Sequence, residues 1–195
     1  MARELAARKV HFFPLLASGT YDTTPLALKW ANELTTTNEY TEVQFLGDGT
    51  IEHDGKKLDK VAVTLSISSQ MPNKDLAKLC GYEYNETTGA MVITTDSVAI
   101  KGALAFEIKM SDGSTKRRVL YNCSLYKNET SNNTDATGED SLYTFEGNAI
   151  PVDINGKEVV ELTIASADIE AMTEAEQKKT ALEKYNSFFE AVVLP

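Results

Sequence analysis

Residues 59–70 read DKVAVTLSISSQ, and this stretch decides the fold class. Its apolar side chains Val61, Val63, Leu65 and Ile67 alternate with small or polar ones, which is the pattern of a strand with one buried and one solvated face. A sheet that is solvated on one face is usually antiparallel. The stretch therefore predicts a mainly antiparallel β fold with its core on one side of this strand.

A second alternation runs through residues 100–110, where Leu104, Phe106 and Ile108 are separated by small or charged residues. The turn sequence SDGS follows, so residues 116–127 are predicted to form the partner strand of a hairpin. Further strands, bounded by Gly, Asn, Asp or Pro, are predicted at residues 10–16, 26–35, 41–46, 91–94, 142–152 and 159–164. Together these strands predict an antiparallel β-sandwich with few helices, an α+β chain dominated by β structure.

One short helix is predicted at residues 73–80. Pro72 precedes it, Leu76 and Leu79 have helical spacing, and Gly81 follows as a C-terminal cap.

A longer amphipathic helix is predicted at residues 173–192. Thr173 and Glu176 have the spacing of a capping box, which marks a helix start. One apolar stripe follows, made of Leu182, Tyr185, Phe188, Phe189 and Val192. The stripe needs a partner surface, either the sheet of its own chain or a neighbouring subunit.

Length and composition favour one domain over residues 1–195, long enough to bury a hydrophobic core. No apolar run approaches the ~20 residues that span a bilayer, so no membrane association is expected. Cys80 and Cys123 lack the spacing of a disulfide framework or a zinc site. The net charge of −10 argues against a surface that grips the phosphates of nucleic acid.

The search for catalytic chemistry finds no candidate. Of the two histidines, His53 lies in the run Glu52-His53-Asp54, but the HExxH spacing and the calcium-loop order are absent. Phosphate-cradling glycine motifs and the GxSxG nucleophile elbow are also absent. We therefore expect no catalytic residue, no metal site and no cofactor, and we expect that the chain is not an enzyme.

Two stretches between the predicted strands stand out. Residues 45–60 (FLGDGTIEHDGKKLDK) carry several Gly and Asp residues and are predicted to form a long, structured turn region that projects from the sheet. Residues 128–140 (NETSNNTDATGED) are polar and acidic, and a solvated loop is expected there.

The order of elements from Leu58 to Val152 resembles the major tail tube proteins of long-tailed (siphovirus-like) bacteriophages, the phi13-type family. The matching features are an alternating strand, a short helix that ends in Leu79-Cys80-Gly81, and a hairpin-like acidic segment. A strand with small residues before an aromatic comes next, followed by the basic strand RRVLYNCSLY at residues 117–126 and a polar loop. The resemblance covers about half of the chain well and the N-terminal third loosely.

This resemblance implies a virion structural protein, made in the cytoplasm of a bacterial host. Six copies would form a ring, and stacked rings would form a hollow tail tube that passes DNA without binding it specifically. A tape measure protein and a tail terminator are the implied partners. By position, the projecting region would reach the next ring through Asp48, Gly49, Glu52, His53 and Asp54.

The polar face of the strand at residues 59–70 is the expected wall of the channel, through Thr64, Ser66 and Ser68. Six copies at −10 each would give −60 per ring, and an anionic channel would not retain DNA phosphates. Two alternatives stay open. The chain could be a tube component of a contractile or secretion apparatus, or a β-sandwich that binds carbohydrate or another ligand through Tyr21, Tyr40, Tyr82 and Tyr84.

Overall fold

The computed structural model describes residues 2–47, 50–132 and 141–195, and in the stretch 44–54 it describes the backbone alone. Twelve strands, β1 to β12, lie within these ranges: Glu4–Pro14, Leu26–Ala27, Ala31–Gly47, Thr50–Ser68, Glu83–Asn85, Ala90–Val92, Lys101–Met110, Thr115–Ser131, Leu142–Ala149, Val152–Ile154, Lys157–Val159 and Glu161–Ala165. The helices are α1 (Asn73–Cys80), α2 (Ser166–Ala171), α3 (Ala175–Asn186) and the 3₁₀ turn η1 (Ser187–Phe189).

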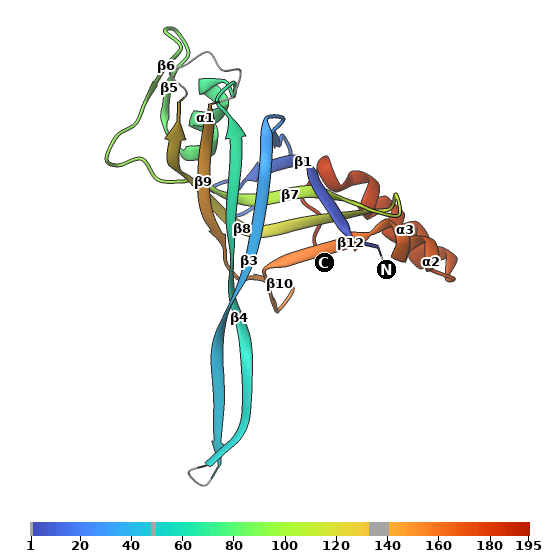
Figure 1. Cartoon of the computed structure of the whole chain (residues 1–195). Helices are drawn as coiled ribbons and strands as arrows, with labels where there is room; N and C mark the ends of the chain where they lie inside the picture. Colours follow the sequence, from blue (N-terminus) through green and yellow to red (C-terminus); the bar gives the residue numbers. More distant parts are fainter. Residues whose placement is uncertain (1, 48–49, 133–140) are drawn as a thin grey trace.

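Eight strands form one antiparallel sheet in the order β2-β1-β7-β8-β9-β4-β3, with β12 added on β8. Strand β8 joins the two halves of this sheet. Its first half pairs with β7 and β12, and its second half, from Cys123 onward, pairs with β9. In Figure 1, β3, β4 and β9 run steeply across β1, β7 and β12, so the bent sheet forms two crossing layers.

The core lies between these two layers. Val61, Val63, Leu65 and Ile67 of β4 are all at most 1% exposed, so the alternation predicted for residues 59–70 is confirmed. They pack in one cluster with side chains from the other layer, including Val10, Phe12, Leu104, Phe106 and Ile108. The predicted fold class, mainly antiparallel β with few helices and a helix near the C-terminus, is confirmed.

The region predicted as a projecting turn is a β-hairpin. Strand β3 continues from Ala31 to Gly47, and β4 pairs with it along almost its whole length, up to Gly47 opposite Thr50. The two strands predicted at residues 26–35 and 41–46 are therefore the short β2 and one long β3. The sequence TTTNEYTE between them has no apolar alternation because both faces of the outer hairpin meet solvent.

Helix α1 has the predicted bounds, Asn73–Cys80, and ends at Gly81 with a left-handed φ of 70°. A side chain at Gly81 would collide with the carbonyl oxygen of Val98, so this position needs both the freedom and the small size of glycine.

The C-terminal helix differs in part from its prediction. Helix α3 starts at Ala175 with Glu174 at the N-cap and no side-chain cap, so the Thr173–Glu176 capping box does not form. The chain leaves regular helix after Asn186 and continues as η1. Phe188 is 1% exposed and packs with Phe13, Ala103, Ala105 and Tyr121 of its own sheet, whereas Leu182 is 41% exposed. The apolar stripe thus docks on its own chain.

The predicted polar loop at residues 128–140 begins later than expected, because β8 continues to Ser131. Residues 133–140 lie outside the described residues. No helix in the described part of the chain is long and apolar enough to cross a membrane.

Candidate assembly surface

One face of the layer formed by β3, β4, β9 and the second half of β8 is polar, and we call it the polar sheet face. Its residues are set by register: Thr35 lies opposite Thr64, Thr64 opposite Glu146, and Glu146 opposite Tyr126. The same alternation gives its members as Glu33, Thr35, Thr37, Glu39, Lys60, Ala62, Thr64, Ser66, Thr144, Glu146, Asn148, Ser124 and Tyr126. The opposite face of the same strands forms the core, so the polar residues of this face are not needed to pack the core.

The three residues predicted to line a channel have different positions. Thr64 is exposed and Ser66 is half-buried, and both belong to the polar sheet face. Ser68 is only 5% exposed, at the end of β4 where the chain turns toward α1. Its backbone N–H donates to the Trp30 carbonyl at 2.9 Å. Ser68 is therefore buried in this chain, unlike Thr64 and Ser66, and its place in a channel wall stays a prediction.

Carboxylates outnumber cations on the polar sheet face. Glu33, Glu39 and Glu146 lie on it, and Lys60 pairs with Glu39 at 3.2 Å. The Asn128 amide donates to Glu146 Oε1 at 2.9 Å, which fixes that carboxylate on the surface. The face therefore combines hydroxyl groups with a net negative charge.

Sequence reasoning missed the β9 part of this face. The signal was present, since Tyr143, Phe145, Gly147 and Ala149 alternate with polar residues in the way that β4 does. Phe145 and Ala149 are fully buried, which leaves Thr144, Glu146 and Asn148 on the outer side.

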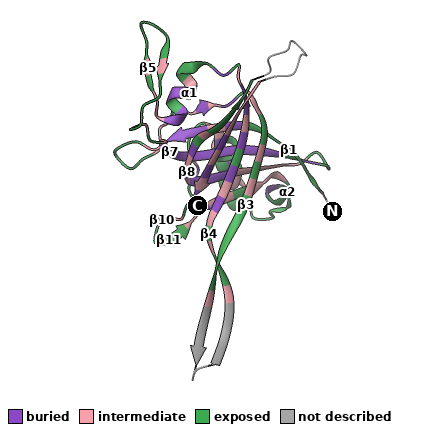
Figure 2. Ribbon diagram, turned by 60° about the vertical axis from the view of Figure 1, so that its left-hand side comes forward, coloured by how far each residue is buried: buried purple, intermediate pink, exposed green. Residues whose placement is uncertain are grey.

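The outer part of the β3–β4 hairpin, residues 40–47 and 50–60, extends away from the body, and we call it the arm (Figures 1 and 2). Strand β9 supports β4 only as far as Val61, which pairs with Ala149. Beyond that point β4 pairs with β3 alone, after an irregularity of register between Glu39 and Tyr40. Lys57 of the arm also forms an exposed ion pair with Glu158 of β11, at 2.9 Å.

The residues predicted to contact the next ring fall at the outer end of this arm. Glu52, His53 and Asp54 belong to β4. His53 and Asp54 lie opposite Phe45 and Gln44 of β3, and Glu52 falls at an irregularity of register, while Asp48 and Gly49 lie outside the described residues. The structure describes no side chain from 44 to 54, so what these groups contact stays a prediction.

Both borders of the polar sheet face contain open strand edges within the described residues. Strand β3 pairs with β4 only. After Ser124, β8 pairs with β9 only, but helix α1 lies beside this border and Cys80 contacts the Lys127 backbone, so the open part of β8 is residues 128–131. Such edges present unpaired backbone N–H and C=O groups to another chain. The two edges are antiparallel to each other, because four successive antiparallel strands alternate in direction.

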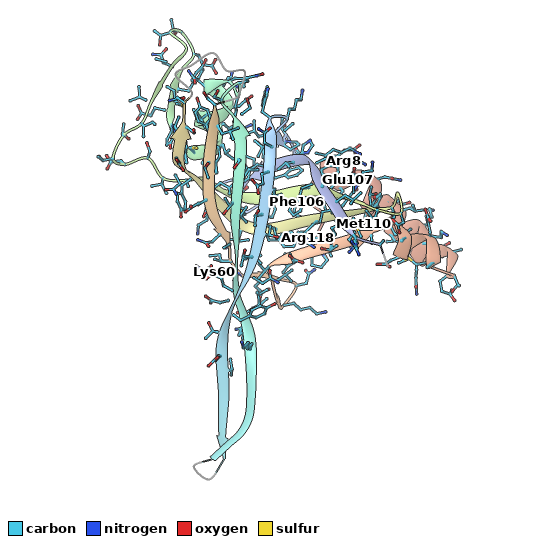
Figure 3. The ribbon with its side chains drawn as sticks, viewed as in Figure 1. Arg8, Lys60, Phe106, Glu107, Met110 and Arg118 are labelled. Atoms are coloured by element: carbon cyan, nitrogen blue, oxygen red, sulfur yellow. The ribbon has the colours of Figure 1, made fainter. Side chains whose placement is uncertain are left out.

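A buried carboxylate fixes the C-terminal segment on the far side of the molecule. Glu107 is 2% exposed and binds Arg8 at 2.8 Å, Lys9 at 3.2 Å and Arg117 at 3.0 Å. Figure 3 labels Arg8 and Glu107, which lie next to each other. Burial by itself would raise the pKa of Glu107, but hydrogen bonds from Arg117 and Lys9 outweigh it and hold the pKa below its usual value. Arg117 in turn stacks on the Tyr185 ring and donates to the Tyr185 carbonyl.

Other groups offer little chemistry. Among the described residues, no three His, Cys, Asp or Glu side chains gather closely enough to hold a metal ion. Cys80 and Cys123 are buried, and burial raises the pKa of Cys123 to about 12, which makes a reactive thiolate unfavourable.

The four tyrosines proposed for ligand binding are dispersed. Tyr40 lies on β3, Tyr84 on β5, and Tyr82 packs against the core between α1 and β5. Tyr21 lines a cavity of about 580 Å³ together with Lys101, Asp153 and Val192.

Comparison with known proteins shows a weak structural likeness. No family model matches the chain, and no curated protein matches it. Among solved structures, the chain is similar to one in the six-fold symmetrised cryo-electron microscopy structure of the anti-feeding prophage baseplate. The TM-score is 0.38 and the identity 7%, over 84% of this chain and 97% of that chain.

Proposed function

We propose that this chain is a structural subunit of the tail tube of a long-tailed bacteriophage, in which six copies form a ring and rings stack around a channel for DNA. The observation that carries the proposal is the polar sheet face, bordered on both sides by open strand edges. A four-stranded layer with a core behind it and hydroxyl and carboxylate groups in front suits the wall of a water-filled channel.

The channel is a passage and not a binding site for DNA. Glu33, Glu39 and Glu146 repel phosphates, and Thr35 and Thr64 offer neutral hydroxyl groups between them. Binding to DNA depends largely on cations that replace condensed counterions, and this face has one, Lys60, already paired with Glu39.

The ring closes by strand addition in this proposal. The β3 edge of one copy joins the exposed part of the β8 edge, residues 128–131, of the next copy. Because these edges are antiparallel within one chain, repeated addition continues an antiparallel sheet without reversing any strand. The contact is heterologous, since different surfaces meet, and such contacts close into rings when the rotation per copy permits.

The arm makes the contact between rings. It leaves the body at Val61 and has few attachments there, so its outer end is free to reach a second layer of subunits. Glu52, His53 and Asp54, with Asp48 and Gly49, are the residues assigned to that contact.

The resemblance of the sequence to tail tube proteins implies two partners for this chain. A tape measure protein and a tail terminator would be its partners. The protein would act in the virion and have no enzymatic role, metal or cofactor.

A tube component of a contractile or secretion apparatus is the close alternative, because the same wall and arm would serve it. A ligand-binding β-sandwich is the distant alternative, and the cavity beside Tyr21 is the observation that favours it.

Negative-stain electron microscopy and sedimentation of the purified full-length chain separate these functions. Rings or hollow tubes are expected for a tube subunit. A chain that stays monomeric at all concentrations tested would contradict the proposal and favour the binding module. Detection of the protein in purified virions would separate a phage tail from a secretion apparatus.

A further inference from the structure

A cavity of about 580 Å³ opens where three distant parts of the chain meet. They are the turn after β1, strand β10 with the turn that follows it, and the tail after η1. Figures 1 and 2 both place the C-terminus close to β10, which marks this part of the molecule. Sites for small molecules have volumes of roughly 300–1,000 Å³, so the space is large enough for one. We call it the outer cavity.

The outer cavity lies behind the layer formed by β1, β7 and β12, away from the polar sheet face. Its lining residues Tyr21, Ile154 and Val192 pack against the cluster that contains Phe13. Phe12, the neighbour of Phe13 on β1, belongs instead to the core between the two layers. Successive side chains of a strand point to opposite faces of a sheet, so the cluster and the core lie on opposite sides of this layer. If the polar sheet face lines a channel, the outer cavity is on the outside of the wall.

Apolar side chains line the inside of the outer cavity, and polar side chains surround its opening. The half-buried part of the lining includes Leu15, Tyr21, Val152, Ile154 and Val192. The exposed part includes Thr20, Thr23, Lys101, Asp153 and Asn155. A ligand that fits here needs an apolar surface on one side and hydrogen-bonding groups on the other.

The charged groups at the opening are of both signs, with Lys101 as a cation and Asp22 and Asp153 as anions. Asp22 Oδ1 accepts the Thr24 N–H at 2.8 Å, and Asp153 Oδ1 accepts the Gly156 N–H at 2.9 Å. These bonds hold both carboxylates in place and leave Oδ2 of each to accept from a ligand. A charged ligand of either sign would meet a like charge at this opening, so a neutral ligand fits best.

Tyr21 supplies an aromatic ring and a hydrogen-bond donor. Its hydroxyl oxygen accepts the Asn122 N–H at 3.4 Å, which leaves its own hydrogen for another group. Burial raises the pKa of Tyr21, so the hydroxyl stays protonated near neutral pH. Asn122 lines the same cavity and has a left-handed φ of 46°, which is uncommon outside glycine and clusters at functional sites. Its side-chain amide adds both a donor and an acceptor.

We propose that the outer cavity binds a neutral saccharide of one or two sugar rings. Such a ligand carries no charge, so neither Lys101 nor the two aspartates oppose it. Its hydroxyl groups both donate and accept hydrogen bonds, which suits the mixture of amide, carboxylate, hydroxyl and ammonium groups at the opening. The C–H face of a sugar ring is apolar and matches the inside of the cavity. This site goes beyond the proposed tube function and does not depend on it.

Saturation-transfer NMR on the purified full-length protein tests the site. The probes are glucose, galactose and N-acetylglucosamine, together with the disaccharides maltose, lactose and chitobiose, each at millimolar concentration. We expect saturation transfer to at least one of these sugars, strongest for the C–H protons of one ring face. No transfer to any of them would overturn the proposal.

Two variants locate the binding. Tyr21→Ala should weaken it about tenfold. Lys101→Ala, an exposed change that should leave the melting temperature unchanged, should weaken it severalfold. Tyr84→Ala, at a tyrosine of β5 outside the outer cavity, is the control and should bind as the wild type does. Binding that stays at the wild-type level in both cavity variants would contradict the assignment.

Decanoate and decylamine test the argument from charge, because each has an apolar chain and a single charge near neutral pH. We expect both to bind more weakly than the best of the sugars. Tighter binding of either ion, weakened by Tyr21→Ala, would overturn the assignment of a neutral ligand. None of these measurements needs assembled rings, so their outcome is independent of the proposed function.

Discussion

The carboxylate of Glu107 lies 3.0 Å from Nε of Arg117. The guanidinium of Arg117 also stacks on the Tyr185 ring, with its carbon 3.9 Å from the ring centre. Arg8 and Lys9 complete the cation set because Lys9 adopts a left-handed φ of 52° at an irregularity in β1. One buried carboxylate thus joins β1, β8 and the C-terminal helix. This arrangement keeps the C-terminal segment on its own sheet.

Glu107→Gln is expected to destabilise the protein by about 3 kcal/mol, because it leaves Arg117 without its charged partner in a largely buried place. Urea unfolding followed by circular dichroism measures the loss. Glu86→Gln is the matched control, since the Glu86–Lys74 pair is exposed and screened by solvent and should contribute little to stability. Equal effects of the two changes would contradict this role of Glu107.

The same carboxylate predicts a dependence on pH. The folded pKa of Glu107 is lowered, so its stabilising contribution is fully present above the unfolded pKa, about 4.3, and is lost as pH falls through the folded value. The difference in unfolding free energy between wild type and Glu107→Gln should be constant near neutral pH and shrink below about pH 4. A difference in unfolding free energy that grows on acidification would contradict the lowered pKa of Glu107.

Phe188→Ala is expected to cost about 3–5 kcal/mol, because this ring is 1% exposed and fills the space beside Ala103 and Ala105. Leu182→Ala, on the same C-terminal segment but 41% exposed, should cost less than about 1 kcal/mol. Thermal unfolding of both variants measures the contrast. Similar losses would mean that the two side chains are equally buried in solution.

Thr64→Lys tests the polar sheet face as a channel wall. Thr64 is exposed and its outward neighbours are Thr35 and Glu146, so the protomer should remain stable and still assemble. Six added cations per ring should make the assembled protein retain DNA in a salt-dependent way, which the wild type should not do. Thr20→Lys, at an exposed turn outside this face, is the control for charge alone. Equal retention by both variants would place Thr64 on the outside.

Removing residues 48–54 tests the arm. The melting temperature should change little, because β4 beyond Val61 pairs only with β3. Rings should still form, but long tubes should be absent in electron micrographs. A triple alanine change at Glu52, His53 and Asp54 keeps the length of the arm. It therefore shows whether tube formation needs these three side chains or only the length of the arm. Normal tubes from the shortened protein would contradict the role of the arm between rings.

The sequence predicted the elements whose pattern is local. The alternation from Val61 to Ile67 and the α1 helix with its Gly81 cap both appear as expected, since burial on one face and a glycine cap leave direct marks in the sequence. The Asn155-Gly156 turn, with φ of 55° and 77°, carried an equally local signal, and it was missed between β10 and β11.

Features that depend on distant contacts could not be predicted in this way. Residues 40–42, where the arm begins, are exposed in succession and carry no apolar alternation, so the arm looked like a turn region. Glu107 alternates with Phe106 and Ile108 and looked like a solvated residue, but the C-terminal segment covers that face. Ser68 has the spacing of Thr64 and Ser66, yet it is buried where β4 turns into α1. Glu146 joins Thr64 only through a strand pairing across some eighty residues of sequence.

A cryo-electron microscopy reconstruction of the assembled protein tests the central claim most directly. We predict a hollow tube of stacked six-membered rings with Thr64 and Glu146 on its inner wall and the arm directed toward the adjacent ring. A tube whose inner wall is formed by another surface, with the polar sheet face turned outward, would contradict it.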